Sequence, residues 1–226
     1  GKIPGEEGEL EAGENIELEF IDGGSMKAGK NILISKNIIN TLAKAKGSIS
    51  CNKEDGLILG GRLSAETSIQ AYDIGSPNET KTEILLDNIT EKKQKIKVLR
   101  DIVKEKKNQL HEGEPNFLRL EKLIKNGHFM DNMNKKQLDK INNTYHMMQE
   151  QRQEIKDQIT PLSSEIQQLE ESIKHGKSPE LNVYGTVFPG VHITINEVHT
   201  IINSQINCVK LTMYGGEIRI HSLKEP

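Results

Sequence analysis

The residues of this chain that are able to do chemistry do not gather into a known catalytic or ligand-binding motif. The pairs Gly60-Gly61 and Gly215-Gly216 lie outside the GxGxxG and GxxxxGK[ST] patterns of phosphate-binding loops, so tight turns explain them better. No serine or cysteine stands in a nucleophile context such as GxSxG. We therefore predict no catalytic residue, no cofactor-binding residue and no cofactor.

The histidines and cysteines give no metal site either. His192, His199 and His221 lie near the C-terminus without a second ligand at a suitable spacing. Cys51 and Cys208 each stand in an apolar, strand-like stretch, and neither belongs to a CxxC motif. We predict no metal site, and we interpret both cysteines as buried free thiols in a reducing compartment.

A basic run is the main argument for a nucleic-acid partner. Eight lysines and arginines lie between Lys92 and Lys107. Against this interpretation, Glu150 to Ile173 carries six acids and two bases, and the run lacks the interleaved aromatic residues typical of single-strand binding. Pairing of the basic run with the acidic segment is the simpler explanation, so a nucleic-acid partner is unlikely on the sequence alone.

Composition favours a thin structure over a thick globule. Of the 226 residues, 34% are hydrophobic and 4% aromatic, with no tryptophan, and the net charge is -3. Narrow solenoids and coiled coils need few large side chains, whereas large globular cores need many. No apolar run is long enough to span a membrane and no signal peptide is present, so we predict a cytoplasmic protein.

A short repeat organises both ends of the chain. It has the form apolar-x-Ala-x-x-x-apolar-x-apolar, and its alanines are 16, 17 and 20 residues apart. The four copies are Leu10/Ala12/Ile16/Leu18, Met26/Ala28/Ile32/Ile34, Ala43/Ala45/Ile49/Cys51 and Leu63/Ala65/Ile69/Ala71. A fifth copy with Pro for Ala, Val187/Pro189/Ile193/Ile195, aligns with the fourth and is expected to pack directly beside it.

The repeat predicts a β-solenoid. Positions two apart on a strand share a face, so each copy supplies a few inward apolar groups that only stacked neighbours can bury. An ordinary β-sandwich and a left-handed hexapeptide acyltransferase are the alternatives, and the second lacks its strict six-residue repeats here. We expect rungs over residues 1–84, closed by the turn formers of residues 73–78.

Residues 85–177 change to a helical period. One heptad seam contains Ile89, Ile96, Leu99, Val103 and Leu110, followed after a Gly/Pro break at 111–116 by a short third segment with Leu120, Leu123 and Ile124. A longer seam contains Leu138, Ile141, Tyr145, Met148, Ile155, Ile159, Leu162, Ile166, Leu169 and Ile173.

The two seams match as an antiparallel coiled-coil hairpin. If the numbers of facing residues add up to 262, Val103 faces Ile159 and Leu110 faces Arg152, the one polar seam position. The tip then falls near Asp131. Pro161 is expected to bend the second helix. Residues 178–226 return to strands that complete the solenoid, and a hairpin of Cys208 to Met213 with Ile218 to Leu223 caps it.

The order of these motifs resembles the flagellar assembly protein A family of bacteria. The resemblance rests on Gly56-Leu-Ile-Leu-Gly-Gly-Arg-Leu-Ser-Ala65, on Asp73-Ile-Gly-Ser76, on the charged hairpin, and on Tyr184-Gly-Thr-Val-Phe-Pro-Gly190-Val-His-Ile193-Thr-Ile195. It implies a right-handed β-helix-like core, a larger parent protein with a further N-terminal domain, a cytoplasmic location, a link to flagellar assembly and no established catalytic site.

The leading hypothesis is therefore a non-enzymatic scaffold. Its solenoid would present a coiled-coil arm to protein partners, through the arm or the solenoid surface, with self-association as a further option. A β-helix enzyme that processes a carbohydrate or another ligand is the alternative, and it would need paired carboxylates on one face. A nucleic-acid-binding arm is the third hypothesis.

Overall fold

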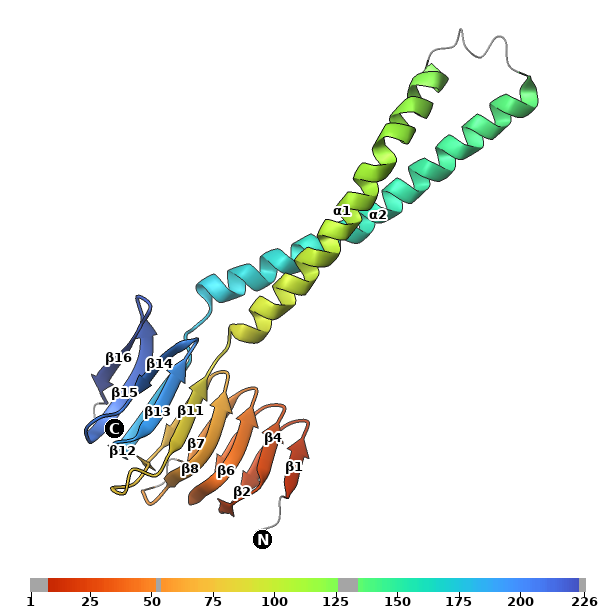
Figure 1. Cartoon of the computed structure of the whole chain (residues 1–226). Helices are drawn as coiled ribbons and strands as arrows, with labels where there is room; N and C mark the ends of the chain where they lie inside the picture. Colours follow the sequence, from red (N-terminus) through yellow and green to blue (C-terminus); the bar gives the residue numbers. More distant parts are fainter. Residues whose placement is uncertain (1–7, 52–53, 126–133, 224–226) are drawn as a thin grey trace. The chain divides into compact units, whose positions relative to one another are not determined.

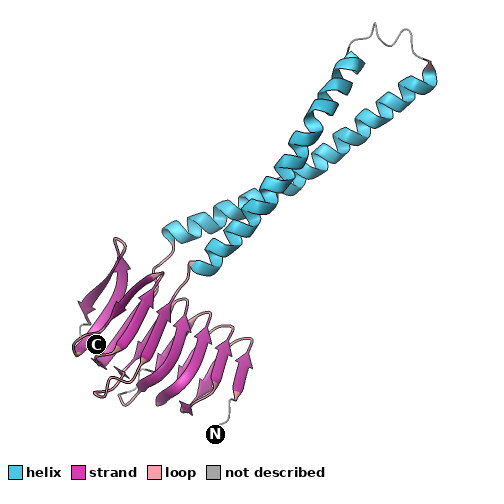
Figure 2. Cartoon of the chain, viewed as in Figure 1, coloured by secondary structure: helices cyan, strands magenta, loops and turns pink. Residues whose placement is uncertain are grey.

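The computed structural model describes residues 8–51, 54–125 and 134–223, which fold into two compact units. The first unit comprises residues 1–90 and 177–226, and we call it the solenoid unit. The second comprises residues 91–176, and we call it the helical insertion. The strands all belong to the solenoid unit (Figure 2).

The strands before the helices are short. They are β1 (Glu9–Ala12), β2 (Ile16–Leu18), β3 (Ile21–Asp22), β4 (Ser25–Ala28), β5 (Ile32–Ile34), β6 (Asn37–Ala45), β7 (Ser48–Cys51), β8 (Leu57–Ala65), β9 (Ser68–Ala71), β10 (Asp73–Ile74) and β11 (Thr82–Leu86). Those after the helices are β12 (Glu180–Val187), β13 (Val191–Ile195), β14 (Val198–Ile201), β15 (Ile206–Tyr214) and β16 (Glu217–Ser222).

The strands wind into a β-solenoid of about four turns, and the strands that stack from rung to rung pair in parallel (Figure 1). One side runs β1, β4, β6, β8, β11, β13, and a second runs β2, β5, β7, β9, β12. The nine-residue strands β6 and β8 turn a corner within themselves. Asn40, Gly60 and Gly61 stand there with positive φ, a conformation that glycine and asparagine tolerate best.

The first four copies of the repeat are confirmed in register. Ala12, Ala28, Ala45 and Ala65 lie opposite one another from rung to rung. Ile16, Ile32, Ile49 and Ile69 form a second column. Because each column repeats one residue type, every rung presents the same shape to the next, and the spacing of 16 to 20 residues is the length of one turn.

The fifth copy was aligned wrongly. Ile193 lies opposite Ile84 of β11, which in turn lies opposite Leu63. Val187 lies opposite Ile74, in a third column. The alignment with the fourth copy failed because β11 had been overlooked: the turn formers of residues 73–78 do not close the first segment, and one more strand follows them.

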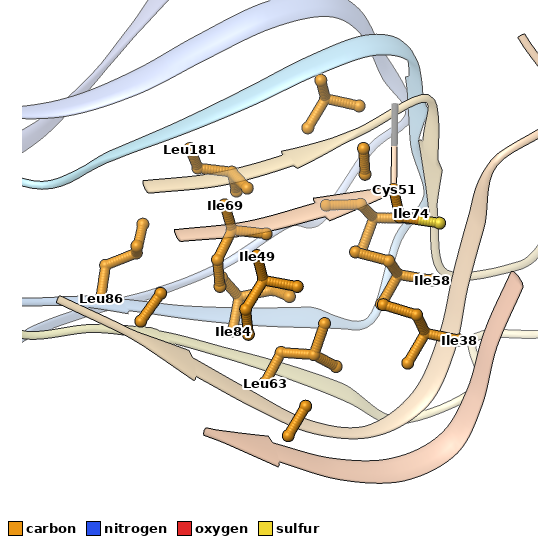
Figure 3. Close-up of a cluster of buried hydrophobic side chains, with 14 of the residues drawn as sticks. Ile38, Ile49, Cys51, Ile58, Leu63, Ile69, Ile74, Ile84, Leu86 and Leu181 are labelled. Atoms are coloured by element: carbon orange, nitrogen blue, oxygen red, sulfur yellow. The ribbon is translucent and has the colours of Figure 1, made fainter. Parts of the chain in front are cut away.

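The inward side chains form one core that the two chain segments share. Ile49, Ile69 and Leu181, from β7, β9 and β12, are fully buried in one stack, and Ile84 and Leu86 of β11 face them (Figure 3). The returning strand β12 pairs directly with β9, so Leu181 continues the column of Ile69. The prediction that the chain resumes the same core after the helices is therefore confirmed.

Antiparallel strands end the solenoid at its C-terminal side. β15 pairs antiparallel with β12 and with β16, and β14 pairs antiparallel with β13. The turn between β15 and β16 is Gly215-Gly216, with φ of 62° and 86°, as a two-residue hairpin turn requires. The predicted hairpin is thus present, and the glycine pair serves the turn.

The helical insertion contains α1 (Thr90–Lys125) and α2 (Lys135–His175). Asn134 caps α2 in a capping box with Gln137, which satisfies backbone amides at its start. The expected tip near Asp131 lies outside the described residues. The predicted start at residue 85 was too early, because Leu85 and Leu86 belong to β11.

The predicted break at 111–116 is also wrong, because α1 continues through Pro115. The heptad positions that begin at Ile89 recur at Leu110, Phe117 and Ile124, so the apolar seam is not interrupted. A continuous seam outweighs the lost hydrogen bond of one proline. The separate third segment is therefore the last part of α1.

Candidate functional site

The helical insertion replaces a two-residue turn of the solenoid. In the third rung, Lys46 and Gly47 connect β6 to β7, and in the fourth rung Glu66 and Thr67 connect β8 to β9. At the same corner of the next rung, β11 ends at Leu86 and β12 begins at Glu180, so residues 87–179 stand in place of the dipeptide. The strands on both sides keep the register of the rungs before them.

Side-chain hydrogen bonds hold the two ends of the insertion together. The Asn88 side-chain amide donates to the Lys177 carbonyl at 2.9 Å, which joins the two chain segments directly. The Asn88 backbone N–H donates to Oδ1 of Asn196, and the Asn196 backbone N–H donates to the Leu86 carbonyl. Oδ1 of Asp87 accepts the backbone N–H groups of Ile89 and Thr90, where α1 begins. The junction is therefore closed by specific contacts within the solenoid unit.

Within the insertion, basic side chains of α1 reach polar side chains of α2. The Lys95 ammonium lies 2.5 Å from Glu165, and the Arg100 guanidinium lies 2.6 Å from Glu170. Lys106 donates to Gln158 at 2.6 Å. Three members of the basic run are therefore engaged by α2, which supports the complementarity of the two helices inferred from their charges.

The apolar seam divides each helix into a covered and an exposed side. Ile96, Leu99 and Val103 of α1 are buried, with exposed fractions of 6% to 8%. The ten apolar seam residues predicted on α2 are all half-buried, while most of their neighbours are exposed. The seams predicted from the heptads are thus the sides of the helices that lose solvent contact.

A polar and aromatic cluster interrupts the seam. Arg152 forms an ion pair with Glu114 at 2.7 Å, and its guanidinium lies 4.4 Å from the centre of the Phe117 ring. Phe117 stacks on Tyr145 with ring centres 5.2 Å apart. Among the described residues, Nη1 of Arg152 is buried without a hydrogen-bond partner. The sequence identified Arg152 as the polar seam position opposite Leu110. Its side chain contacts Glu114 and Phe117, further along α1, and the heptad that continues to Phe117 was the signal for these neighbours.

Several apolar side chains of the insertion remain exposed on the sides away from the seams. Val98 and Ile102 are 58% and 37% exposed and stand one helical turn apart on α1. Leu118 and Met147 are 41% and 61% exposed. Of these, only Val98 and Ile102 stand together at helical spacing, which is the usual arrangement of the anchors by which a helix binds a protein partner.

On the solenoid unit, polar residues meet across strands β8, β11, β13 and β14. Arg62, Glu83 and His192 lie side by side in the ladder, and the His199 ring centre is 5.4 Å from that of His192. They line a hollow of about 160 Å³. The Lys81 ammonium, which hydrogen-bonds Glu83, holds the pKa of this carboxyl below its ordinary value. Of the three histidines considered in the sequence, His192 and His199 are therefore brought together, and His221 lies on β16.

A metal centre usually has three or more protein ligands. Over the part of the chain that the structure describes, no group of three or more His, Cys, Asp or Glu side chains could hold a metal ion. An ionised Glu83 beside Lys81 and Arg62 is also unsuited to donate a proton. Arg62, Glu83 and His192 form a row of polar side chains on neighbouring strands of the sheet.

The cysteines are free, as their spacing indicated. Burial raises the pKa of the Cys51 thiol to about 12, so the thiol stays protonated and is a poor nucleophile. Its Sγ donates to the Lys36 carbonyl inside the rung. Cys208 is half-buried, and its thiol donates to the Tyr184 carbonyl.

Neither of the two described helices combines the length and the apolarity that a membrane span requires. Neither the search of curated proteins nor the search of solved structures finds a match. The model of one protein family, the flagellar assembly protein A beta solenoid domain, matches residues 1–218. That match covers nearly all of both chain segments and the insertion between them, and the chain therefore belongs to the flagellar assembly protein A family.

Proposed function

We propose that this protein is a non-enzymatic scaffold of bacterial flagellar assembly whose helical insertion is an arm that binds a protein partner. One observation carries the proposal: the insertion stands where the preceding rungs have two residues, and the rungs on both sides keep their register. A segment that the core does not require is free to serve binding. The family resemblance supports the flagellar role and a cytoplasmic location.

We infer that the arm is an antiparallel coiled-coil hairpin formed by residues 91–176. The contacts between its helices support this pairing, because partners on α2 fall in number as those on α1 rise, from Arg100 with Glu170 to Phe117 with Tyr145. The numbers of Phe117 and Tyr145 add up to 262, as the facing seams require. The right-handed winding of the solenoid is part of the same proposal and follows from the family.

The partner would contact the outward side of α1 at Val98 and Ile102. These side chains are exposed although the seam residues beside them are buried, so they do not serve the contact with α2. Basic residues flank them: Lys97 and Lys104 on α1 carry no ion pair among the described residues. An apolar pair within a basic surface favours a partner helix that is apolar and acidic.

The alternatives have less support. A β-helix enzyme needs a carboxyl group that is able to donate a proton, whereas the carboxyl pKa values displaced in this structure, those of Glu83 and Glu180, are both lowered. A nucleic-acid-binding arm needs a free basic surface, whereas Lys95, Arg100 and Lys106 are engaged by α2.

The proposal is tested in the flagellated bacterium that encodes this chain, with the gene deleted and restored. The native protein should restore flagella and motility. A variant in which residues 87–179 are replaced by the dipeptide Glu-Thr, copied from the fourth rung, should fold and accumulate but fail to restore motility. Flagella are counted by electron microscopy, and protein levels are measured by immunoblot.

Point variants refine this test. Replacing Val98 and Ile102 by glutamine should reduce motility severalfold, because the anchors of the partner are lost while the seam is untouched. Leu118→Gln, an equally exposed position of the same helix, is the matched control and should behave as the native protein. Full motility with the dipeptide variant would contradict the proposed role of the arm.

A further inference from the structure

Basic residues recur along one side of helix α1. They follow one another at intervals of four, three, four and three residues, and they are Lys93, Lys97, Arg100, Lys104 and Lys107. This spacing keeps the five side chains on one side of a helix, and all of them are exposed. At the rise of an α-helix they span about 21 Å of its axis. We call these five residues the basic side of α1.

The contacts between the two helices use other basic residues. Lys95 and Lys106, which reach side chains of α2, lie on the opposite border of the buried seam. Of the basic side, Arg100 forms an ion pair with α2. Three further members form no ion pair among the described residues: Lys97, Lys104 and Lys107. Their charges do not serve the contact with α2 and are available to a partner.

A hollow of about 410 Å³ opens on the basic side. It is lined by Lys93, Ile96, Lys97, Arg100, Asp101 and Glu170. Arg100 compensates the charge of Glu170, with which it pairs at 2.6 Å. Two lysines then face one remaining carboxylate, so the hollow has a net positive charge at neutral pH. Its volume is ample for a phosphate group, which would find ammonium donors beside it.

The composition of the basic side indicates which kind of partner it fits. All members but one are lysines, which act as flexible point charges, whereas fixed recognition of a phosphate or a base is the usual task of arginine. A partner helix would need apolar anchors, and the exposed pair Val98 and Ile102 lies outside this set. Stacked bases would need aromatic side chains, which the set lacks. A bilayer with acidic phospholipids offers many negative charges in no fixed register and meets these conditions.

We propose that the basic side of α1 binds the surface of a bilayer that contains acidic phospholipids. Because the five residues follow the helix axis, α1 would lie along this surface, with the phosphate of a head group in the hollow. No apolar side chain belongs to the set, so attraction between opposite charges is the main contribution. The proposal concerns a surface other than Val98 and Ile102, and it holds whether or not a partner helix binds there.

Flotation of the full chain with lipid vesicles tests this proposal. We expect the chain to float with vesicles of equal parts phosphatidylglycerol and phosphatidylcholine, and not with vesicles of phosphatidylcholine alone. Binding should weaken as sodium chloride is raised, because salt screens the attraction between exposed charges. Inorganic phosphate at the same ionic strength should weaken binding no more than sodium chloride does.

Two triple variants with the same loss of charge locate the binding surface. The first removes the lysines of the basic side that form no ion pair: Lys97→Gln, Lys104→Gln and Lys107→Gln. It should weaken binding to the acidic vesicles by about tenfold or more, because each lysine near an acidic surface contributes about fivefold. The control removes exposed lysines from the start of α2: Lys135→Gln, Lys136→Gln and Lys140→Gln. It should keep most of the binding.

Circular dichroism and the melting temperature establish that both variants fold, and the single change Lys104→Gln replaces the first variant if that variant unfolds. Failure of the native chain to float with the acidic vesicles would overturn the proposal, as would equal flotation with both kinds of vesicle. Equal losses in the two triple variants would show that the basic side is not the binding surface. Stronger displacement by inorganic phosphate than by sodium chloride would assign the hollow to free phosphate. Retention of duplex DNA at a salt concentration that releases the vesicles would assign the basic side to nucleic acid.

Discussion

The solenoid unit and the helical insertion are stabilised in different ways. In the solenoid, most inward side chains of the rungs after the first are almost inaccessible, and many are fully buried. In the insertion, only Ile96, Leu99 and Val103 are buried among the residues described there, and the seam of α2 is half-buried throughout. The solenoid depends on contacts between distant rungs, whereas the insertion depends on one seam. Equivalent substitutions should therefore have unequal effects.

The largest effect is expected in the middle of the solenoid. Ile69→Asp places a carboxylate in a column that is fully buried and contains no polar partner, so it should destabilise the chain by about 3 kcal/mol or more. Gln70→Asp, one residue on and directed outward, is the control and should cost far less. Equal losses in the free energy of unfolding, measured with urea, would contradict the assigned register.

A seam residue of the insertion should matter less. Val103→Asp puts a charge in the best-covered part of α1, but the helices are able to separate locally and hydrate it, so we expect a loss of about 1–2 kcal/mol. Hydrogen exchange should accelerate in α1 and α2 and stay unchanged in β7 and β9. Faster exchange in the solenoid strands would show that the two regions unfold as one.

The polar cluster sharpens the comparison within the insertion itself. Arg152→Leu removes a guanidinium with one buried nitrogen that lacks a partner among the described residues, and it restores an apolar seam position. The free energy of unfolding of the helices should therefore stay constant or rise by less than about 1 kcal/mol. Arg152→Ala, which leaves the space beside Phe117 unfilled, should lower it. A marked loss with Leu would mean that the ion pair with Glu114 stabilises the helices strongly.

The smallest effect concerns pH. Burial acts to raise the pKa of Glu180, but hydrogen bonds from Lys210 and Asn182 outweigh it, and the pKa lies below its ordinary value of 4.5. A lowered folded-state pKa stabilises the protein above the unfolded-state value, and the stabilisation disappears as pH falls through the folded-state value. Below about pH 4.5 the native chain should therefore lose slightly more stability than Glu180→Gln in urea unfolding. Parallel pH profiles of the two proteins would exclude this contribution.

The repeat was predictable because each rung imposes the same shape on the next. Alanine at the corner and isoleucine in the middle recur where the columns require them, so the four copies share one pattern in the sequence. Strand β11 was missed because Leu86 replaces the alanine and because turn formers precede it. Its signal was nevertheless present, since Ile84 follows Leu63 by 21 residues, close to the length of one turn.

The helical seams were predictable for the same reason, but their local partners were not. Heptad spacing determines which side of a helix is covered, and the half-buried residues of α2 are those that the spacing indicated. Heptad spacing does not determine which residues a long polar side chain contacts. The Arg152 side chain therefore contacts Glu114 and Phe117, which follow Leu110 by four and seven residues.

The central claim is that the solenoid core is complete without the helical insertion. The most direct test is calorimetry of the chain in which the dipeptide Glu-Thr replaces residues 87–179, the interval that separates Leu86 from Glu180. The account predicts one cooperative transition near the temperature at which the solenoid strands of the intact chain unfold, because β11, β12 and β13 keep their neighbours. Soluble aggregate without a cooperative transition, alongside cooperative unfolding of the intact chain, would contradict it and show that the returning strands need the helices in order to fold.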